Sequence, residues 1–200
     1  MAWIEIIPQA QASGQLEKLY KRVSGPGGQI DNILQVHSLR PATLEGHLRM
    51  YKNVLHHRQN QLPKWLLEML GCYVSLCNQC DYCFDHHTAG LRRLLNDEAK
   101  SNLVLQALKT KKWHNLLEPR SAALLDYADR LTNSPGAMVS DDVAALRHAG
   151  LDDGEILEAN QVIAYFAYAN RTVLGLGVDT SGEVLGLSPS SDDPDHWNHR

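Results

Sequence analysis

The amino-acid sequence predicts an all-α protein, and three observations carry that prediction. Apolar residues recur at spacings of three and four through most of the 200 residues, which is the spacing of one helix face. Sustained alternation of apolar and polar residues, the pattern of half-buried strands, is scarce. Helix breakers such as Gly25-Pro26-Gly27-Gly28 and Asn133-Ser134-Pro135-Gly136 divide the chain into segments of ordinary helix length.

The first half of the chain predicts five helices. They cover Gln11 to Arg22, Ile30 to His37, Ala42 to His56, a segment from Pro63 to about Cys77, and a last one that ends near Leu95. Pro63 suits the first turn of a helix. Asn78 is the candidate N-cap of the fifth helix, with Asp81 close to the positive end of its dipole.

The second half predicts four more helices. They run from Asn96-Asp97-Glu98 to Leu108, from Glu118 to Thr132, from Ser140 to the stop at Gly150, and from Ile156 to Leu174. The last of these has few polar positions. We therefore expect it in the core or at a subunit interface.

Length and composition predict one globular domain over residues 1–187, followed by a mobile tail, residues 188–200, with little apolar content. The net charge of -4 and the absence of any Lys/Arg run argue against a nucleic-acid partner. The N-terminus does not resemble a signal peptide, and no window approaches the ~20 apolar residues of a membrane span. We expect a cytoplasmic protein that does not bind membranes.

The cysteines are concentrated in one place. Cys72, Cys77, Cys80 and Cys83 lie within twelve residues, whereas a secreted disulfide framework spreads its cysteines along the chain. Because residues three and four apart share a helix face, Cys80, Cys83 and His87 form one stripe. Such clustering suggests a redox or metal site.

Glu68 is predicted to lie opposite that stripe, on the preceding helix. If two helices form an antiparallel hairpin that turns at Cys77 and Asn78, Glu68 lies level with His87. A carboxylate that orients and charges an imidazole lets it stabilise a thiolate or accept its proton. Two cysteines spaced C-x-x-C can also close a disulfide, so each can resolve a sulfenic acid on the other. The pattern favours a peroxidase or a dithiol reductant.

The same residues also have simpler interpretations. The C-x-x-C pair could be two buried small residues. Zinc bound by Cys77, Cys80, Cys83 and His87 is disfavoured, because these side chains diverge around a helix. We assign no role to Cys72 or Cys77. We expect His86 at the surface or at an interface.

The pattern Glu68, eleven residues, Cys80, two residues, Cys83, three residues, His87 resembles the alkylhydroperoxidase D-like branch of the carboxymuconolactone decarboxylase superfamily. Leu91-Arg92-Arg93-Leu94 and the stretch 170–178, which resembles the peroxidase-related subgroup, extend the likeness over roughly residues 44–178. The resemblance implies a multi-helix fold with the C-x-x-C at the start of a helix in an antiparallel hairpin. It also implies a homo-oligomer, a trimer or a hexamer.

The activity implied by the resemblance is hydroperoxide reduction by Cys80 and Cys83, with Glu68 and His87 as a proton relay and with no metal or organic cofactor. A thiol or lipoyl-type donor would reduce the disulfide again. The family pattern makes Cys83 the attacking thiol, whereas the helix N-terminus favours Cys80, and both assignments stay open. Tyr82 stands where the best-known member has a relay histidine.

Two other functions compete with this one. The first is a carboxymuconolactone decarboxylase-type enzyme, although such enzymes do not need the cysteine pair. The second is a redox-responsive oligomeric interaction protein, in which oxidation of Cys80 and Cys83 changes assembly or partner binding without turnover.

Overall fold

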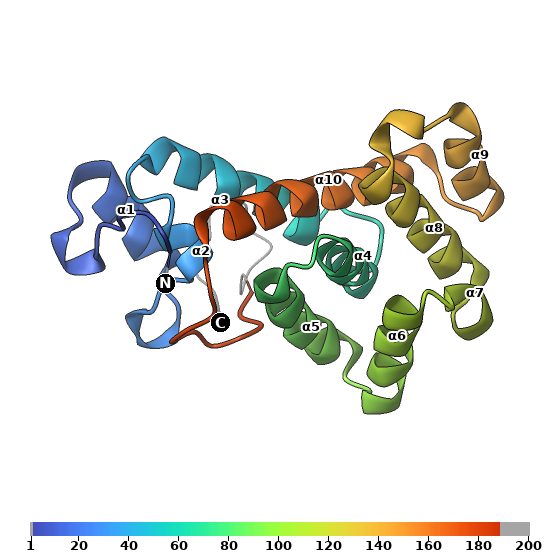
Figure 1. Ribbon diagram of the computed structural model, residues 1–200, viewed down its shortest axis with the longest axis horizontal. Coiled ribbons are helices and arrows are strands. Elements are labelled where there is room, and N and C mark those ends of the chain that lie inside the picture. The colour runs from blue at the N-terminus through green and yellow to red at the C-terminus, as the bar shows by residue number, and fades with distance from the viewer. Residues whose placement is uncertain (1, 189–200) are drawn as a thin grey trace.

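The computed structural model describes residues 2–188, and within that range every regular element is helical, as the sequence predicts (Figure 1). Ten α-helices and three short 3-10 helices follow one another along this part of the chain. The predicted mobile tail lies outside the described residues, apart from Ser188.

The core is built around α4 (Lys64–Cys77), an apolar helix that most of the domain surrounds (Figure 1). Helices α5 (Asp81–Leu95), α8 (Pro119–Asn133) and α10 (Asp153–Leu176) pack against it. Gly71 makes the α4–α10 contact possible, because a Cβ at this position would overlap the ring of Phe166. The long α10 is thus a core helix, which is one of the two places predicted for it.

The remaining helices extend the core to both sides. Helix α3 (Pro41–His56) runs beside α10, and α1 (Gly14–Val23) and α2 (Asn32–Gln35) complete that end of the molecule (Figure 1). The other end is formed by α6 (Glu98–Thr110), α7 (Trp113–Leu116) and α9 (Ser140–His148). The 3-10 helices are η1 (Gln9–Gln11), η2 (Pro26–Gly28) and η3 (Pro135–Ala137).

The α4–α5 turn corrects one predicted cap. Asn78 is the C-cap of α4 and not the N-cap of α5, which is Cys80. Gln79 adopts a left-handed φ of 55°, and the N–H of Cys80 donates to the carbonyl of Ser75 at 2.9 Å. These are the features of a Schellman motif. This tight turn places Cys80 at the positive end of α5 as soon as α4 has ended.

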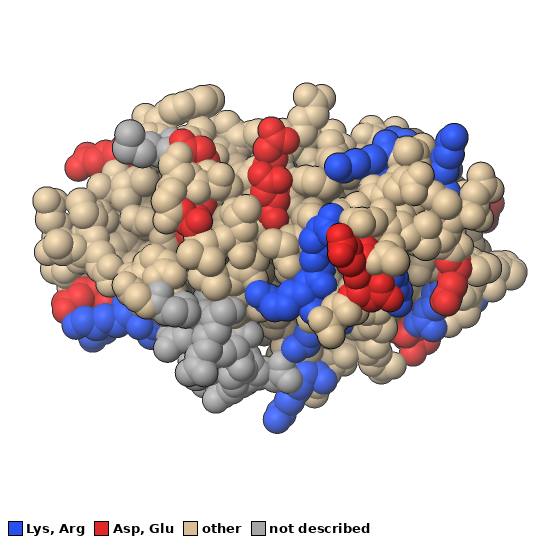
Figure 2. Space-filling view, turned by 90° about the horizontal axis from the view of Figure 1, so that it is seen from below, with Lys and Arg blue, Asp and Glu red and all other residues tan. Residues whose placement is uncertain are grey.

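The structure also contains α7, which the sequence analysis did not predict, and several helix boundaries differ from the prediction. The first helix begins at Gly14, because the 3-10 turn of η1 stands apart from it, and α2 spans only Asn32–Gln35 of the predicted Ile30 to His37. None of the described helices is long and apolar enough to cross a lipid bilayer. Acidic and basic side chains are interspersed over the face shown in Figure 2.

Candidate active site

Glu68 and His87 form a hydrogen-bonded carboxylate–imidazole pair between α4 and α5. The Oε2 of Glu68 lies 2.7 Å from Nδ1 of His87. Glu68 is 4% exposed, and Gly90, one turn after His87, lies beside its carboxylate. The ring of Phe166 supports the imidazole from α10, with its centroid 4.5 Å away in an edge-on geometry. The antiparallel hairpin therefore brings the two predicted residues together.

Cys80 and Cys83 lie at the first turn of α5, and both are buried free thiols. Hydrogen bonding from the Cys83 thiol lowers the pKa of Cys80, and burial only partly opposes this effect. The same bond, together with burial, raises the pKa of Cys83 well above its usual range. Of the two thiols, Cys80 therefore loses its proton more readily than Cys83.

Asn170 of α10 is a site residue that the sequence analysis did not identify. Its fully buried amide hydrogen-bonds both thiols and lowers the pKa of each. Asn170 donates to Ser75 Oγ at 3.1 Å and accepts from Asn78 Nδ2 at 2.9 Å, so its orientation is fixed. The signal for it in the sequence was an amide side chain on an otherwise apolar helix face.

A pocket opens onto one thiol of the pair. Cys83 lines it together with Glu68 and His87, whereas Cys80 is not among the lining residues. Two buried phenols, Tyr51 and Tyr165, complete the wall on the side of α3 and α10, and burial raises the pKa of both well above the usual range. The pocket thus joins a thiol, a carboxylate–imidazole pair and neutral phenols.

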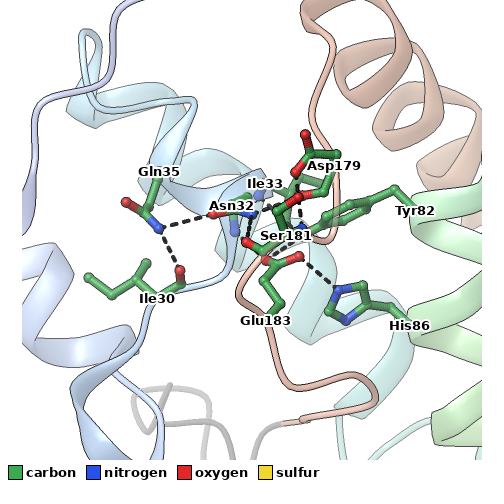
Figure 3. Close-up of polar contacts among 9 residues, drawn as sticks. All are labelled: Ile30, Asn32, Ile33, Gln35, Tyr82, His86, Asp179, Ser181 and Glu183. Carbon is green, nitrogen blue, oxygen red and sulfur yellow. Dashed lines mark hydrogen bonds and ion pairs between the residues drawn. The ribbon is translucent and has the colours of Figure 1, made fainter. Parts of the chain in front are cut away.

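The C-terminal segment after α10 carries a second carboxylate to the site (Figure 3). Glu183 Oε1 accepts from the Tyr82 hydroxyl at 2.8 Å and from the backbone N–H of Asn32, and its Oε2 lies 3.2 Å from Nε2 of His86. Of the two places predicted for His86, the surface is therefore wrong, because its side chain is only 11% exposed and is covered by this segment.

The other two cysteines lie away from the pocket. Cys72 is fully buried, its thiol lies 3.7 Å from Thr88 Oγ1, and burial raises its pKa. Cys77 is half-buried at the end of α4, next to Asn133. Among residues 2–188, His, Cys, Asp and Glu side chains form no group of three or more that could hold a metal ion.

This architecture is the alkylhydroperoxidase D-like fold, the fold of the family that the sequence resembles. The chain is similar to an uncharacterized peroxidase-related protein with an alkylhydroperoxidase AhpD core from Ralstonia eutropha JMP134, with a TM-score of 0.76 and 21% identity over 92% of this chain and 97% of that chain. A peroxidase-related protein from Silicibacter sp. TM1040 gives 0.72 and 22% identity, with 89% and 91% covered.

The same fold also serves other chemistry. The debrominase Bmp8 is similar to this chain with a TM-score of 0.67 and 17% identity, covering 87% of this chain and 89% of that chain. A variant of that debrominase has been crystallised with 2,3,4-tribromopyrrole. No protein-family model and no curated protein matches the sequence. These likenesses establish the fold alone and do not define the activity of this protein.

Proposed function

We propose that this protein is a thiol-dependent hydroperoxide reductase that uses Cys80, Cys83, Glu68 and His87. One observation carries the proposal. A thiol of the C-x-x-C pair and a buried carboxylate–imidazole pair line the same pocket, with the partner thiol in hydrogen-bonding contact behind it. A hydroperoxide in this pocket would meet a nucleophile and a proton source together.

Cys83 is proposed as the attacking thiol, and its place in the pocket wall, which Cys80 does not share, supports this choice. Its proton passes to the Cys80 thiolate, and the Cys83 sulfur attacks the peroxide oxygen, which breaks the O–O bond. Cys83 becomes a sulfenic acid, and the alkoxide takes a proton from the imidazolium of His87 to leave as an alcohol. The Cys80 thiol then condenses with the sulfenic acid, forming the disulfide and water. The dithiol supplies both electrons.

The low pKa of Cys80 has a different use in this scheme. Its thiolate accepts the shared proton at the start, and after the disulfide is reduced it is the sulfur on which negative charge is most stable. Glu68 orients His87 through Nδ1, which leaves the other ring nitrogen for the substrate. Both residues therefore act on the proton, and neither takes part in a covalent bond.

Completion of the cycle requires partners. We propose a thiol or lipoyl-type electron donor that reduces the Cys80–Cys83 disulfide, a reducing compartment such as the cytoplasm, and a homo-oligomer, a trimer or a hexamer. No metal or organic cofactor enters the scheme.

A free-thiol count by intact mass tests the proposal, before and after one equivalent of hydrogen peroxide. Wild type is expected to lose two thiols, and Cys80→Ser to trap a sulfenic acid on Cys83. Cys83→Ser is expected not to react, and Cys77→Ser, outside the pocket, serves as the matched control and is expected to behave as wild type. Unchanged thiols in wild type would refute the peroxidase. Rapid oxidation of Cys83→Ser at Cys80 would reverse the roles of the two cysteines.

A second candidate is reductive dehalogenation of a small aromatic ring, favoured by the likeness to the debrominase. Two thiols would supply the electrons that replace a carbon–bromine bond by carbon–hydrogen, giving bromide, a proton and the Cys80–Cys83 disulfide. Release of bromide from 2,3,4-tribromopyrrole, without oxidation by hydrogen peroxide, would favour this activity over the first. An assembly that shifts with redox state and turns over neither substrate would instead indicate a redox-responsive interaction protein.

A further inference from the structure

The segment after α10, residues 177–188, turns back beside α5 (Figures 1 and 3). Its last residues form one wall of the pocket. Gly186, Leu187 and Ser188 line the pocket from this segment, opposite residues of α4 and α10. Leu187 also reaches the loop before α2, because a Cβ on Gly25 would lie 3.5 Å from its Cδ1. The segment therefore spans the opening from α5 to the N-terminal helices. We name residues 177–188 the strap.

Polar contacts hold the strap at two points. Glu183 binds Tyr82, His86 and the N-terminus of α2, and its side chain is only 4% exposed. Arg93 of α5 donates to the carbonyl of Gly186 and, at 2.7 Å, to Ser188 Oγ. Tyr82 also accepts from the N–H of Ile33 at 3.2 Å. The strap, α2 and α5 are thus tied into one structure beside the thiols.

Gly186 allows the strap to lie directly on α5. A Cβ at this position would come within 2.7 Å of the Ala89 Cβ and 3.1 Å of the Gly90 nitrogen, so any side chain here would lift the strap. Gly182 has almost the same backbone, with a φ of 81° against 78° for Gly186, but nothing lies within 4 Å of its added Cβ. Alanine substitutions at the two glycines therefore separate the effect of overlap with α5 from the effect of backbone strain.

The closed strap leaves little room. The free volume of the pocket is about 50 Å³, and on the same measure a single water needs roughly 10–15 Å³. Hydrogen peroxide is comparable in size to water, whereas the aromatic ring of cumene hydroperoxide is far larger than this space.

We propose that the strap, through Gly186 and Leu187, restricts the reaction at Cys83 to small hydroperoxides of the size of hydrogen peroxide. This inference rests on the proposed peroxidase function and adds the substrate class to it. Leu187 lines the pocket, Gly186 lets the strap lie close to α5, and Glu183 and Arg93 hold the strap in place. Bulky hydroperoxides react only when the strap is lifted or shortened.

The test compares rates of thiol loss with hydrogen peroxide and with cumene hydroperoxide. Wild type is expected to prefer hydrogen peroxide, and Gly186→Ala to reduce that preference by about tenfold or more, the scale on which a pocket discriminates by size. Gly182→Ala, which adds the strain without the overlap, is expected to keep the wild-type ratio. Leu187→Ala opens the pocket without lifting the strap, so it tests the proposal if Gly186→Ala does not fold.

The result that overturns the proposal is an unchanged ratio in Leu187→Ala, or a wild type that consumes both peroxides at similar rates. Failure of the peroxidase itself is recognised separately, as no oxidation by either peroxide. In that case the rate of Cys83 alkylation, mapped by peptide mass, tests whether the strap restricts access to Cys83, independently of peroxidase activity. A closed strap predicts faster labelling by iodoacetamide than by N-phenylmaleimide, with the difference reduced in Leu187→Ala, and equal ratios in both proteins would refute it.

Discussion

Replacement of Cys83 by alanine is expected to raise the pKa of Cys80, because the Cys83 thiol is the main group that stabilises the Cys80 thiolate. A hydrogen bond to a charged acceptor contributes about 1.5–3 kcal/mol, and one pKa unit corresponds to about 1.4 kcal/mol. At a pH below this pKa, the thiolate fraction of Cys80 should therefore fall by about tenfold or more. The amide of Asn170 and the helix N-terminus remain in the variant, and they keep the pKa from rising further.

The assay is the pH dependence of iodoacetamide alkylation at Cys80, mapped by peptide mass. Only the thiolate reacts, so a lowered pKa keeps the wild-type protein reactive to lower pH. As the pH falls, Cys83→Ala should lose reactivity first. Cys72→Ala is the matched control, because Cys72 is equally buried on the same hairpin but bonds to Thr88 instead of Cys80. The same midpoint in wild type and Cys83→Ala would show that the two thiols do not share a proton.

Three further variants test the rest of the site. Glu68→Gln keeps the side-chain volume beside His87 but removes the charge, so the rate of peroxide reduction should fall by about 100-fold or more while the thermal stability changes little. An unchanged rate would contradict the proposed proton relay. Gly71→Ala should destabilise the fold by about 1–3 kcal/mol in denaturant unfolding, because the new methyl overlaps Phe166, whereas Gly46→Ala on the exposed face of α3 should be neutral or stabilising. Asn170→Ala should cost about 1–3 kcal/mol by the same measurement, since Ser75 and Asn78 lose a buried partner, and equal unfolding midpoints would contradict this network.

Much of the fold could be predicted because it depends on local spacing. Apolar periodicity and Gly/Pro breakers predict the helices, and short turns make consecutive helices antiparallel neighbours. Glu68 and His87 meet for this reason, since a tight turn joins their helices and both lie at similar distances from it. The cap was harder to predict, because Asn78 suits either end of a helix, and the left-handed Gln79 decides that it ends α4.

The contacts around the thiols could not be predicted in the same way. Asn170 reaches Ser75 across 95 positions, and Glu183 reaches Tyr82 across 101 positions. No periodic pattern encodes such distances, and the strap has no regular secondary structure from which to infer its course. The motif alone suggested that His86 points outward, but the strap covers it.

The sequence by itself therefore determined an all-helical chain and the positions of Glu68, Cys80, Cys83 and His87 on one hairpin, because these depend on spacings within two adjacent helices. Only the tertiary structure decided which thiol lines the pocket, which thiol loses its proton more readily, and how far the pocket is closed. Those properties depend on burial and on side chains from α10 and the strap. Their placement follows from packing of the whole chain, which local spacing does not specify.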